Sequence, residues 1–132
     1  MQEFSGRTAV ITGGASGIGL GMARSFAKRG MHLVLADLDE ELLRAAAQEF
    51  SGAGVSVVSQ VCDASKLEDV ERLAEAAMDR FGAVHVVCSN AGVGLPTSAL
   101  NFKLSDWEWI INVDLWGPIY AVKTFLPLIE AQ

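Results

Sequence analysis

The sequence is poor in cysteine, in basic residues and in long apolar runs, and each shortage excludes a class of protein. Its 132 residues include two cysteines, too few for a disulfide framework or a cysteine metal cluster. Lysine and arginine number 10 against 16 acidic residues, and the net charge of −6 argues against nucleic acid as the main partner. No apolar run approaches the ~20 residues of a membrane span. The N-terminal residues lack the pattern of a secretory leader, so we expect a cytoplasmic protein without a membrane partner.

Hydrophobic residues make up 51% of the chain, enough for the core of a single domain over residues 1–132. Short apolar runs alternate with amphipathic segments. The predicted strands cover residues 7–12, 31–37, 55–61 and 84–88, and the predicted helices cover residues 18–29, 39–50, 65–81 and 106 onward. This alternation predicts parallel strands joined by right-handed crossovers, with helices on both faces. The expected fold class is α/β: a Rossmann-type three-layer αβα unit with strand order 3-2-1-4.

The ends of the predicted helices give two further expectations. Ser65 with Glu68, and Ser105 with Glu108, have the Ser-x-x-Glu spacing of a capping box, which predicts a helix start at each serine. The last predicted helix has no glycine cap where the sequence stops. We therefore expect a domain that is truncated before later strands, with the fourth strand left as an exposed edge.

A glycine-rich segment lies directly between the first predicted strand and the first predicted helix. It contains Gly13, Gly17 and Gly19 in the spacing Gly-x-x-x-Gly-x-Gly. Residues without a Cβ permit a tight turn and a close approach of dinucleotide phosphates to the helix N-terminus. The residues after Gly19 do not match a P-loop. A tight strand-to-helix turn without a ligand is the alternative interpretation.

An acidic residue, Asp37, ends the second predicted strand about 20 residues after the glycines, where an acid accepts hydrogen bonds from the adenosine ribose. Its charge would repel the 2′-phosphate of NADP. Ser16 and Leu38, the neighbouring positions where a compensating cation could stand, are uncharged. These residues favour NAD as the cofactor. Alternatively, Asp37 caps the second helix, a role that Asp39 could also fill.

Together with three later segments, these residues resemble the N-terminal part of the short-chain dehydrogenase/reductase family over essentially the whole chain. The matching pieces are residues 12–19, Asp37, Cys62 with Asp63, residues 89–92 (Ser-Asn-Ala-Gly) and residues 113–117 (Val-Asp-Leu-Trp-Gly). The resemblance implies that Asp63 contacts the adenine and that the Asn90 segment supports the sheet beside the cofactor. Without it, Asp63 and Asn90 would be ordinary loop residues. The implied cofactor-binding residues are Gly13, Ser16, Gly17, Ile18, Gly19, Asp37, Leu38, Cys62, Asp63, Asn90, Ala91 and Gly92.

The resemblance also implies a catalytic Ser and a Tyr-x-x-x-Lys pair, which this sequence does not contain. The single tyrosine, Tyr120, has Thr124 four residues later and is interpreted as a packing residue of the last helix. Asp114 stands where the family has an Asn that orders a water near the catalytic Lys, so Asp114 is the candidate catalytic residue. An Asp accepts hydrogen bonds but donates none and adds a charge. A plain polar helix residue is the alternative for Asp114.

The other polar and aromatic candidates favour structural roles. His32 and His85 lie on predicted strands without metal-ligand spacing, and no metal site is expected. Cys62 and Cys88 follow strands separated by roughly 14 Å in the expected order, too far for a disulfide. The resemblance implies that the last helix, with its tryptophans and aliphatic residues, packs against its counterpart in a homo-oligomer.

Two functions follow from these patterns. The first is an NAD-dependent oxidoreductase that transfers hydride between nicotinamide and an alcohol or ketone, of which this chain is the cofactor-binding part. The second is a catalytically inert nucleotide-binding or interaction module. A methyltransferase of similar α/β pattern is disfavoured by the glycine-rich turn and the Asn-Ala-Gly segment. For the isolated chain we predict no dehydrogenase turnover.

Overall fold

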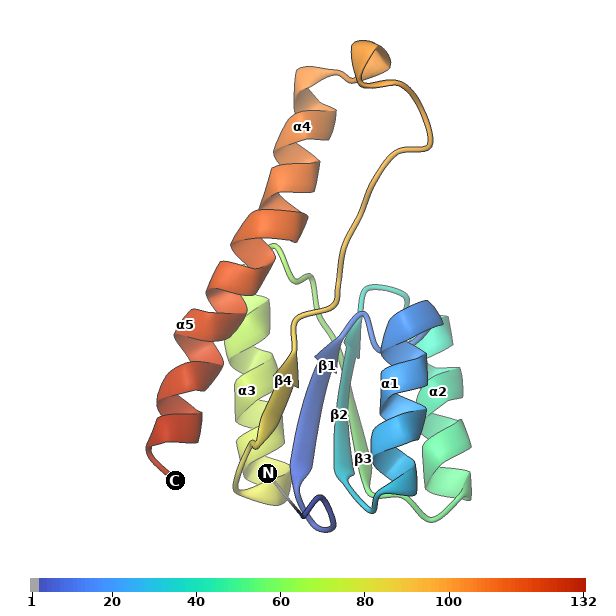
Figure 1. Ribbon diagram of the computed structural model, residues 1–132, viewed down its shortest axis with the longest axis vertical. Helices are drawn as coiled ribbons and strands as arrows, with labels where there is room; N and C mark the ends of the chain where they lie inside the picture. Colours follow the sequence, from blue (N-terminus) through green and yellow to red (C-terminus); the bar gives the residue numbers. More distant parts are fainter. Residues whose placement is uncertain (1–2) are drawn as a thin grey trace.

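A four-stranded parallel sheet, in the order β3-β2-β1-β4, forms the centre of the molecule (Figure 1). The computed structural model describes residues 3–132. Its strands are β1 (Thr8–Thr12), β2 (His32–Asp37), β3 (Val57–Val61) and β4 (Val86–Cys88). Its α-helices are α1 (Gly17–Lys28), α2 (Glu40–Gly52), α3 (Leu67–Phe81), α4 (Leu104–Ile111) and α5 (Gly117–Glu130). The predicted fold class and strand order are confirmed, and most predicted element ends lie within two residues of those observed.

Both faces of the sheet are covered, as the apolar strands predict. Helices α1 and α2 lie on one face, and α3 and α5 lie on the other (Figure 1). Because side chains alternate along a strand, β1 directs Val10 toward the α3–α5 core and Ile11 toward the α1–α2 core. Every residue of β1 is buried. Burial on this scale fixes the register of the central strands, and therefore the positions of the loops that follow them.

Both capping-box predictions are wrong. Helix α3 begins at Leu67, because Ser65 directs its hydroxyl and its amide to the carboxylate of Asp63 instead of capping the helix. Helix α4 begins at Leu104, because Asp106 accepts a hydrogen bond from the Lys103 amide at 2.9 Å and so starts the helix before Ser105. In both places an aspartate takes over the hydrogen bonding that the serine pattern predicts.

The last predicted helix is interrupted in the middle. Residues Asn112–Trp116 form a π-helical segment between α4 and α5, and the helix starts earlier than the predicted residue 106. A π-helical turn widens the helix locally and often accompanies a functional site. In Figure 1, α4 and the loop that precedes it extend past the carboxyl ends of the strands, whereas α5 packs beside α3.

The remaining structural expectations concern histidine and cysteine. His32 stacks on Phe81 with ring centroids 4.8 Å apart, and His85 accepts a hydrogen bond from the Thr8 amide through Nδ1 at 3.0 Å. Cys62 and Cys88 are both free thiols, as the strand order predicts. Within residues 3–132, no group of histidine, cysteine or acidic side chains could hold a metal ion, and no helix is long and apolar enough to cross a membrane.

Candidate functional site

The predicted cofactor residues meet in one pocket of about 400 Å³ at the carboxyl ends of the strands. A larger groove of about 700 Å³ between α2 and β3 contains none of them. Two predicted site residues, Gly19 and Asp114, do not line the pocket, although both contact residues that do. The lining residues are Gly13, Ser16, Gly17, Ile18, Asp37, Leu38, Cys62, Asp63, Ala64, Asn90, Ala91, Gly92, Val93 and Val113.

The glycine-rich turn brings the backbone close to the first turn of α1. Gly13 and Gly17 have φ angles of +64° and +53°, a region that favours glycine. A Cβ at Gly19 would lie 2.0 Å from the Gly13 carbonyl oxygen, so the turn closes only with glycine there. Ser16, at the N-cap position, makes no capping hydrogen bond through its side chain, and the first turn of α1 has no acidic residue. The helix N-terminus can therefore receive an anion such as a phosphate.

Asp37 connects this turn to the end of β2. One carboxylate oxygen, Oδ2, accepts a hydrogen bond from the Ala15 amide at 3.1 Å, and the other accepts one from the Asp39 amide at 3.1 Å. The cap of α2 is Asp39, whose side chain accepts from the Leu42 amide, so Asp37 is not the capping residue. The Asp37 carboxylate is thus fixed beside the turn, at the place where a ribose would follow the phosphates.

Thr12 joins the ends of β1 and β4, a role that the sequence analysis missed. Its hydroxyl oxygen accepts hydrogen bonds from the Asn90 and Ala91 amides at 3.0 and 3.1 Å. The Asn90 side chain in turn donates to the carbonyl oxygens of Thr12 and Gly13 at 3.1 and 3.2 Å. These four bonds hold the Asn90 loop against the glycine-rich turn. The signal for Thr12 was a hydroxyl side chain at the carboxyl end of the first strand, directly before the glycine-rich segment.

The loop after β3 forms the other end of the pocket. Asp63 Oδ1 accepts hydrogen bonds from the Ser65 amide and hydroxyl at 3.0 and 2.6 Å, and the Asp63 amide donates to Asp69 at 2.8 Å. Burial, together with the charges of Asp69 and Asp63, raises the pKa of the Cys62 thiol to about 12. Cys62 therefore contributes a neutral wall to the pocket and not a reactive thiolate.

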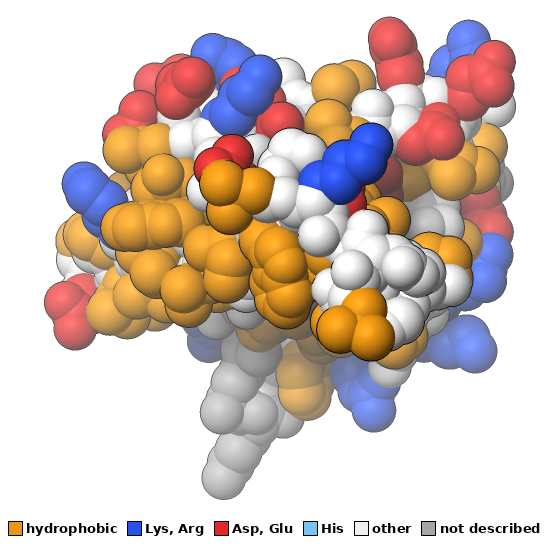
Figure 2. All heavy atoms as spheres, turned by 90° about the horizontal axis from the view of Figure 1, so that it is seen from above, with side chains coloured by type: hydrophobic (Ala, Val, Ile, Leu, Met, Phe, Trp, Pro, Cys, Tyr) orange, Lys and Arg blue, Asp and Glu red, His pale blue; other side chains and the backbone are white. Residues whose placement is uncertain are grey.

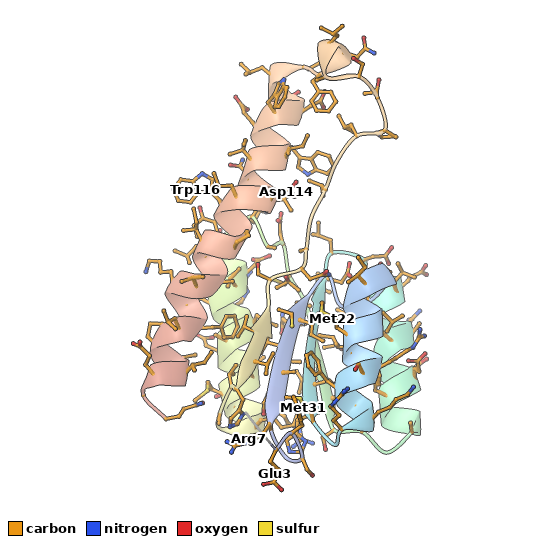
Figure 3. The ribbon with its side chains drawn as sticks, in the orientation of Figure 1. Glu3, Arg7, Met22, Met31, Asp114 and Trp116 are labelled. Atoms are coloured by element: carbon orange, nitrogen blue, oxygen red, sulfur yellow. The ribbon has the colours of Figure 1, made fainter. Side chains whose placement is uncertain are left out.

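The π-helical segment and the first residue of α5 contact the two loops at the ends of the pocket. Asp114 Oδ1 accepts a hydrogen bond from the Val93 amide at 2.8 Å, and Figure 3 shows Asp114 on the side facing the loop after β4, opposite Trp116. Gly117 packs against the loop after β3, where an added Cβ would lie 3.2 Å from the Ala64 carbonyl oxygen. The π-helical segment thus meets the loop after β4, and the start of α5 meets the loop after β3.

Tyr120 lies away from the pocket. It is not among the residues that line it; its ring packs against the α3–α5 core and lies 5.7 Å from the Trp116 ring. This placement fits the packing role that the sequence predicts.

Comparison with known proteins decides which family has this arrangement. The model of the short chain dehydrogenase family matches residues 7–132. The chain belongs to this family. It is 34% identical over 132 residues to a CLA biosynthesis dehydrogenase/reductase of Lactiplantibacillus plantarum. The match covers 100% of this chain and 46% of that protein. The chain therefore spans about half the length of the curated relatives it matches.

Solved structures of the short chain dehydrogenase family superpose closely on this fold. A short chain dehydrogenase/reductase of Burkholderia phymatum in complex with NAD has a TM-score of 0.97 and 39% identity, and the match covers 100% of this chain and 47% of that one. A metagenomic short-chain oxidoreductase in complex with NADP has a TM-score of 0.88 and 34% identity, with coverages of 96% and 58%. Related structures thus include complexes with either dinucleotide.

Proposed function

We propose that this chain is the cofactor-binding part of an NAD-dependent oxidoreductase that transfers hydride between nicotinamide and an alcohol or ketone. The observation that carries the proposal is the position of Asp37, whose carboxylate is fixed beside the glycine-rich turn by the Ala15 amide at 3.1 Å. An acid at this place accepts hydrogen bonds from a ribose, and the open N-terminus of α1 accepts the phosphates. The family supplies the reaction class, dehydrogenation.

The preference for NAD over NADP rests on charge. The 2′-phosphate of NADP would lie near the Asp37 carboxylate, and contact between like charges is unfavourable. The neighbouring pocket residues Ser16 and Leu38 are neutral, so no lysine or arginine at those positions compensates for the repulsion. NAD carries a free ribose hydroxyl there, which Asp37 can bind.

Calorimetric titration with each dinucleotide tests this preference. We expect tighter binding of NAD⁺ than of NADP⁺ by the wild type, and a smaller difference in Asp37→Asn, because the variant removes the repelling charge. The matched control is Asp79→Asn, which removes one charge from an exposed position at the end of α3, outside the pocket. Equal or tighter binding of NADP⁺ by the wild type would contradict the proposal.

Turnover is expected to need residues outside this chain. The sequence has one tyrosine, Tyr120, which packs in the α3–α5 core and has no lysine four residues later. We therefore propose that the isolated polypeptide binds the cofactor but does not oxidise secondary alcohols. Production of NADH from a panel of such alcohols by the pure polypeptide would refute this part of the proposal.

The exposed apolar side of the π-helical segment and α5 supports a homo-oligomer. Hydrophobic side chains gather on the face seen in Figure 2. The exposed apolar residues of the π-helical segment and α5 include Leu115, Ile119 and Val122, which is 59% exposed, and these three border a shallow apolar hollow. A second copy of the chain would cover this surface. We expect a dimer or larger assembly in size-exclusion chromatography with light scattering, and a smaller species for Val122→Asp; a monodisperse wild-type monomer would contradict this.

The cytoplasm is the compartment that fits the proposal. Cys62 and Cys88 are free thiols. Cys62 follows β3 and Cys88 ends β4, the two strands at opposite edges of the sheet, so they do not form a disulfide, as is usual in proteins of reducing compartments. Localisation of a tagged protein in the cell of origin tests this expectation.

A further inference from the structure

The order of the strands gives a bound dinucleotide a direction across the pocket. Asp37 ends β2, the glycine-rich turn follows β1, and the loop containing Val93 follows β4. If the adenosine ribose lies at Asp37 and the phosphates at the N-terminus of α1, as proposed above, the second nucleoside lies on the β4 side. That side of the pocket includes Val93, which lies on the loop after β4. The nicotinamide end is therefore the end beside the loop after β4, where Asp114 of the π-helical segment contacts Val93.

Asp114 places a carboxylate at this end. Its Oδ1 accepts the Val93 amide at 2.8 Å and would lie 3.5 Å from a Cβ at Gly92, so the side chain is held against two consecutive residues of the pocket loop. The ion pairs within 4.0 Å among residues 3–132 join Arg24 to Glu49, Lys66 to Asp63 and Arg72 to Asp69. None of these includes Asp114, so its charge is not neutralised by a neighbouring cation.

The two forms of the cofactor differ in charge at the nicotinamide ring. The oxidised ring carries one positive charge and the reduced ring is neutral, whereas the rest of the dinucleotide is the same. A fixed anion near the ring attracts the oxidised form and leaves the reduced form almost unaffected. The 2′-phosphate lies at the opposite end, so this argument holds for either NAD or NADP.

We propose that the Asp114 carboxylate, held against the Val93 amide at the nicotinamide end of the pocket, makes this site bind the oxidised cofactor more tightly than the reduced one. The inference rests on the proposed function, because it requires a nicotinamide dinucleotide in the pocket. By thermodynamic linkage, the same factor shifts the equilibrium between the two bound forms toward the oxidised form. Asp114 acts here through its charge and needs no proton transfer.

The ratio of two dissociation constants tests the proposal. NADH binding is measured by its fluorescence and NAD⁺ binding by calorimetry, for the wild type and for Asp114→Asn. The amide oxygen of asparagine can still accept the Val93 amide, so this variant removes the charge and keeps the hydrogen bond. We expect the ratio Kd(NADH)/Kd(NAD⁺) to be lower in Asp114→Asn by about threefold or more. This is the size expected when one charge–charge attraction, weakened by surrounding water, is removed. Glu130→Gln, an exposed charge at the far end of α5, should leave the ratio unchanged.

Each outcome separates the inference from the proposed function. If both forms bind the wild type and the ratio is the same in Asp114→Asn, the inference is overturned and the proposed function stands. If neither form binds the wild type, the proposed function fails, and the inference fails with it. A salt series on the wild type does not depend on the folding of the variant. Raising ionic strength should lower the ratio, because salt screens the exposed Asp114 charge, and a constant ratio would contradict the proposal.

Discussion

Replacing Gly19 by alanine tests the closure of the glycine-rich turn. The new Cβ would lie 2.0 Å from the Gly13 carbonyl oxygen and 2.7 Å from the Asn90 side-chain nitrogen. Real Cβ atoms do not approach this closely, so the turn must move away from the first turn of α1. Overpacking of this kind costs about 1–3 kcal/mol, and it exceeds the gain of up to about 1 kcal/mol that alanine brings to a helix.

Gly21→Ala is the matched control because it lies in the same helix and has the opposite expectation. A Cβ at Gly21 would meet nothing within 4 Å, so only the gain in helix propensity remains. We expect Gly21→Ala to raise the free energy of unfolding by about 0.5–1 kcal/mol, and Gly19→Ala to lower it.

Urea unfolding followed by circular dichroism measures both variants. Because both variants share the gain in helix propensity, they should differ by the overpacking cost, about 1–3 kcal/mol, in the free energy of unfolding, with similar m-values. Gly19→Ala should also lose affinity for NAD⁺, since the displaced turn carries the proposed phosphate site. Equal stabilities of the two variants would refute the close approach of the turn to the helix.

Three further predictions concern Thr12, His85 and Cys62. Thr12→Val removes the hydroxyl oxygen that accepts hydrogen bonds from the Asn90 and Ala91 amides. Because both amides then lack this partner, the variant should lower the free energy of unfolding by about 1–3 kcal/mol in urea titrations; an unchanged midpoint would contradict this. Burial, with the nearby Arg7, lowers the pKa of His85 from 6.5, so its contribution to stability is present above pH 6.5 and is lost as pH falls through the lower folded-state pKa. Unfolding midpoints should therefore depend less on pH in His85→Gln between pH 7 and 5, and an unchanged dependence would refute this role. Cys62, with a pKa of about 12, should react with a thiol reagent at pH 8 far more slowly in the folded protein than in urea, and equal rates would show that the thiol is accessible and ionised.

Much of the fold and of the pocket could be predicted because both depend on periodicity. Apolar strands alternating with helices predict a parallel sheet, and the carboxyl ends of parallel strands meet at one edge. Residues as distant in sequence as Gly13, Asp37 and Asn90 therefore line one pocket. The bonds of Asp37 to the Ala15 amide and of Asn90 to Thr12 also depend on atomic positions that no pattern specifies.

The details that could not be predicted depend on competition between local hydrogen bonds. Ser65 has the spacing of a helix cap, yet its hydroxyl and its amide both donate hydrogen bonds to the Asp63 carboxylate. The π-helical segment Asn112–Trp116 has the same apolar pattern as an ordinary helix. Its tertiary contacts involve residues distant in sequence: the Val93 amide donates to Asp114 within the segment, and Ala64 lies against Gly117, the residue that follows it.

An NMR titration tests most directly the central claim, that a dinucleotide binds in the pocket at the carboxyl ends of the strands. Backbone amide spectra of the ¹⁵N-labelled chain, recorded as NAD⁺ is added, report which residues contact the dinucleotide. The account predicts that the largest shifts occur at Gly17, Ala15 and Ala91, around the pocket at the carboxyl ends of the strands, and that residues of the groove between α2 and β3, such as Ser51, do not respond. Shifts confined to that groove, or no shifts at millimolar NAD⁺, would contradict it.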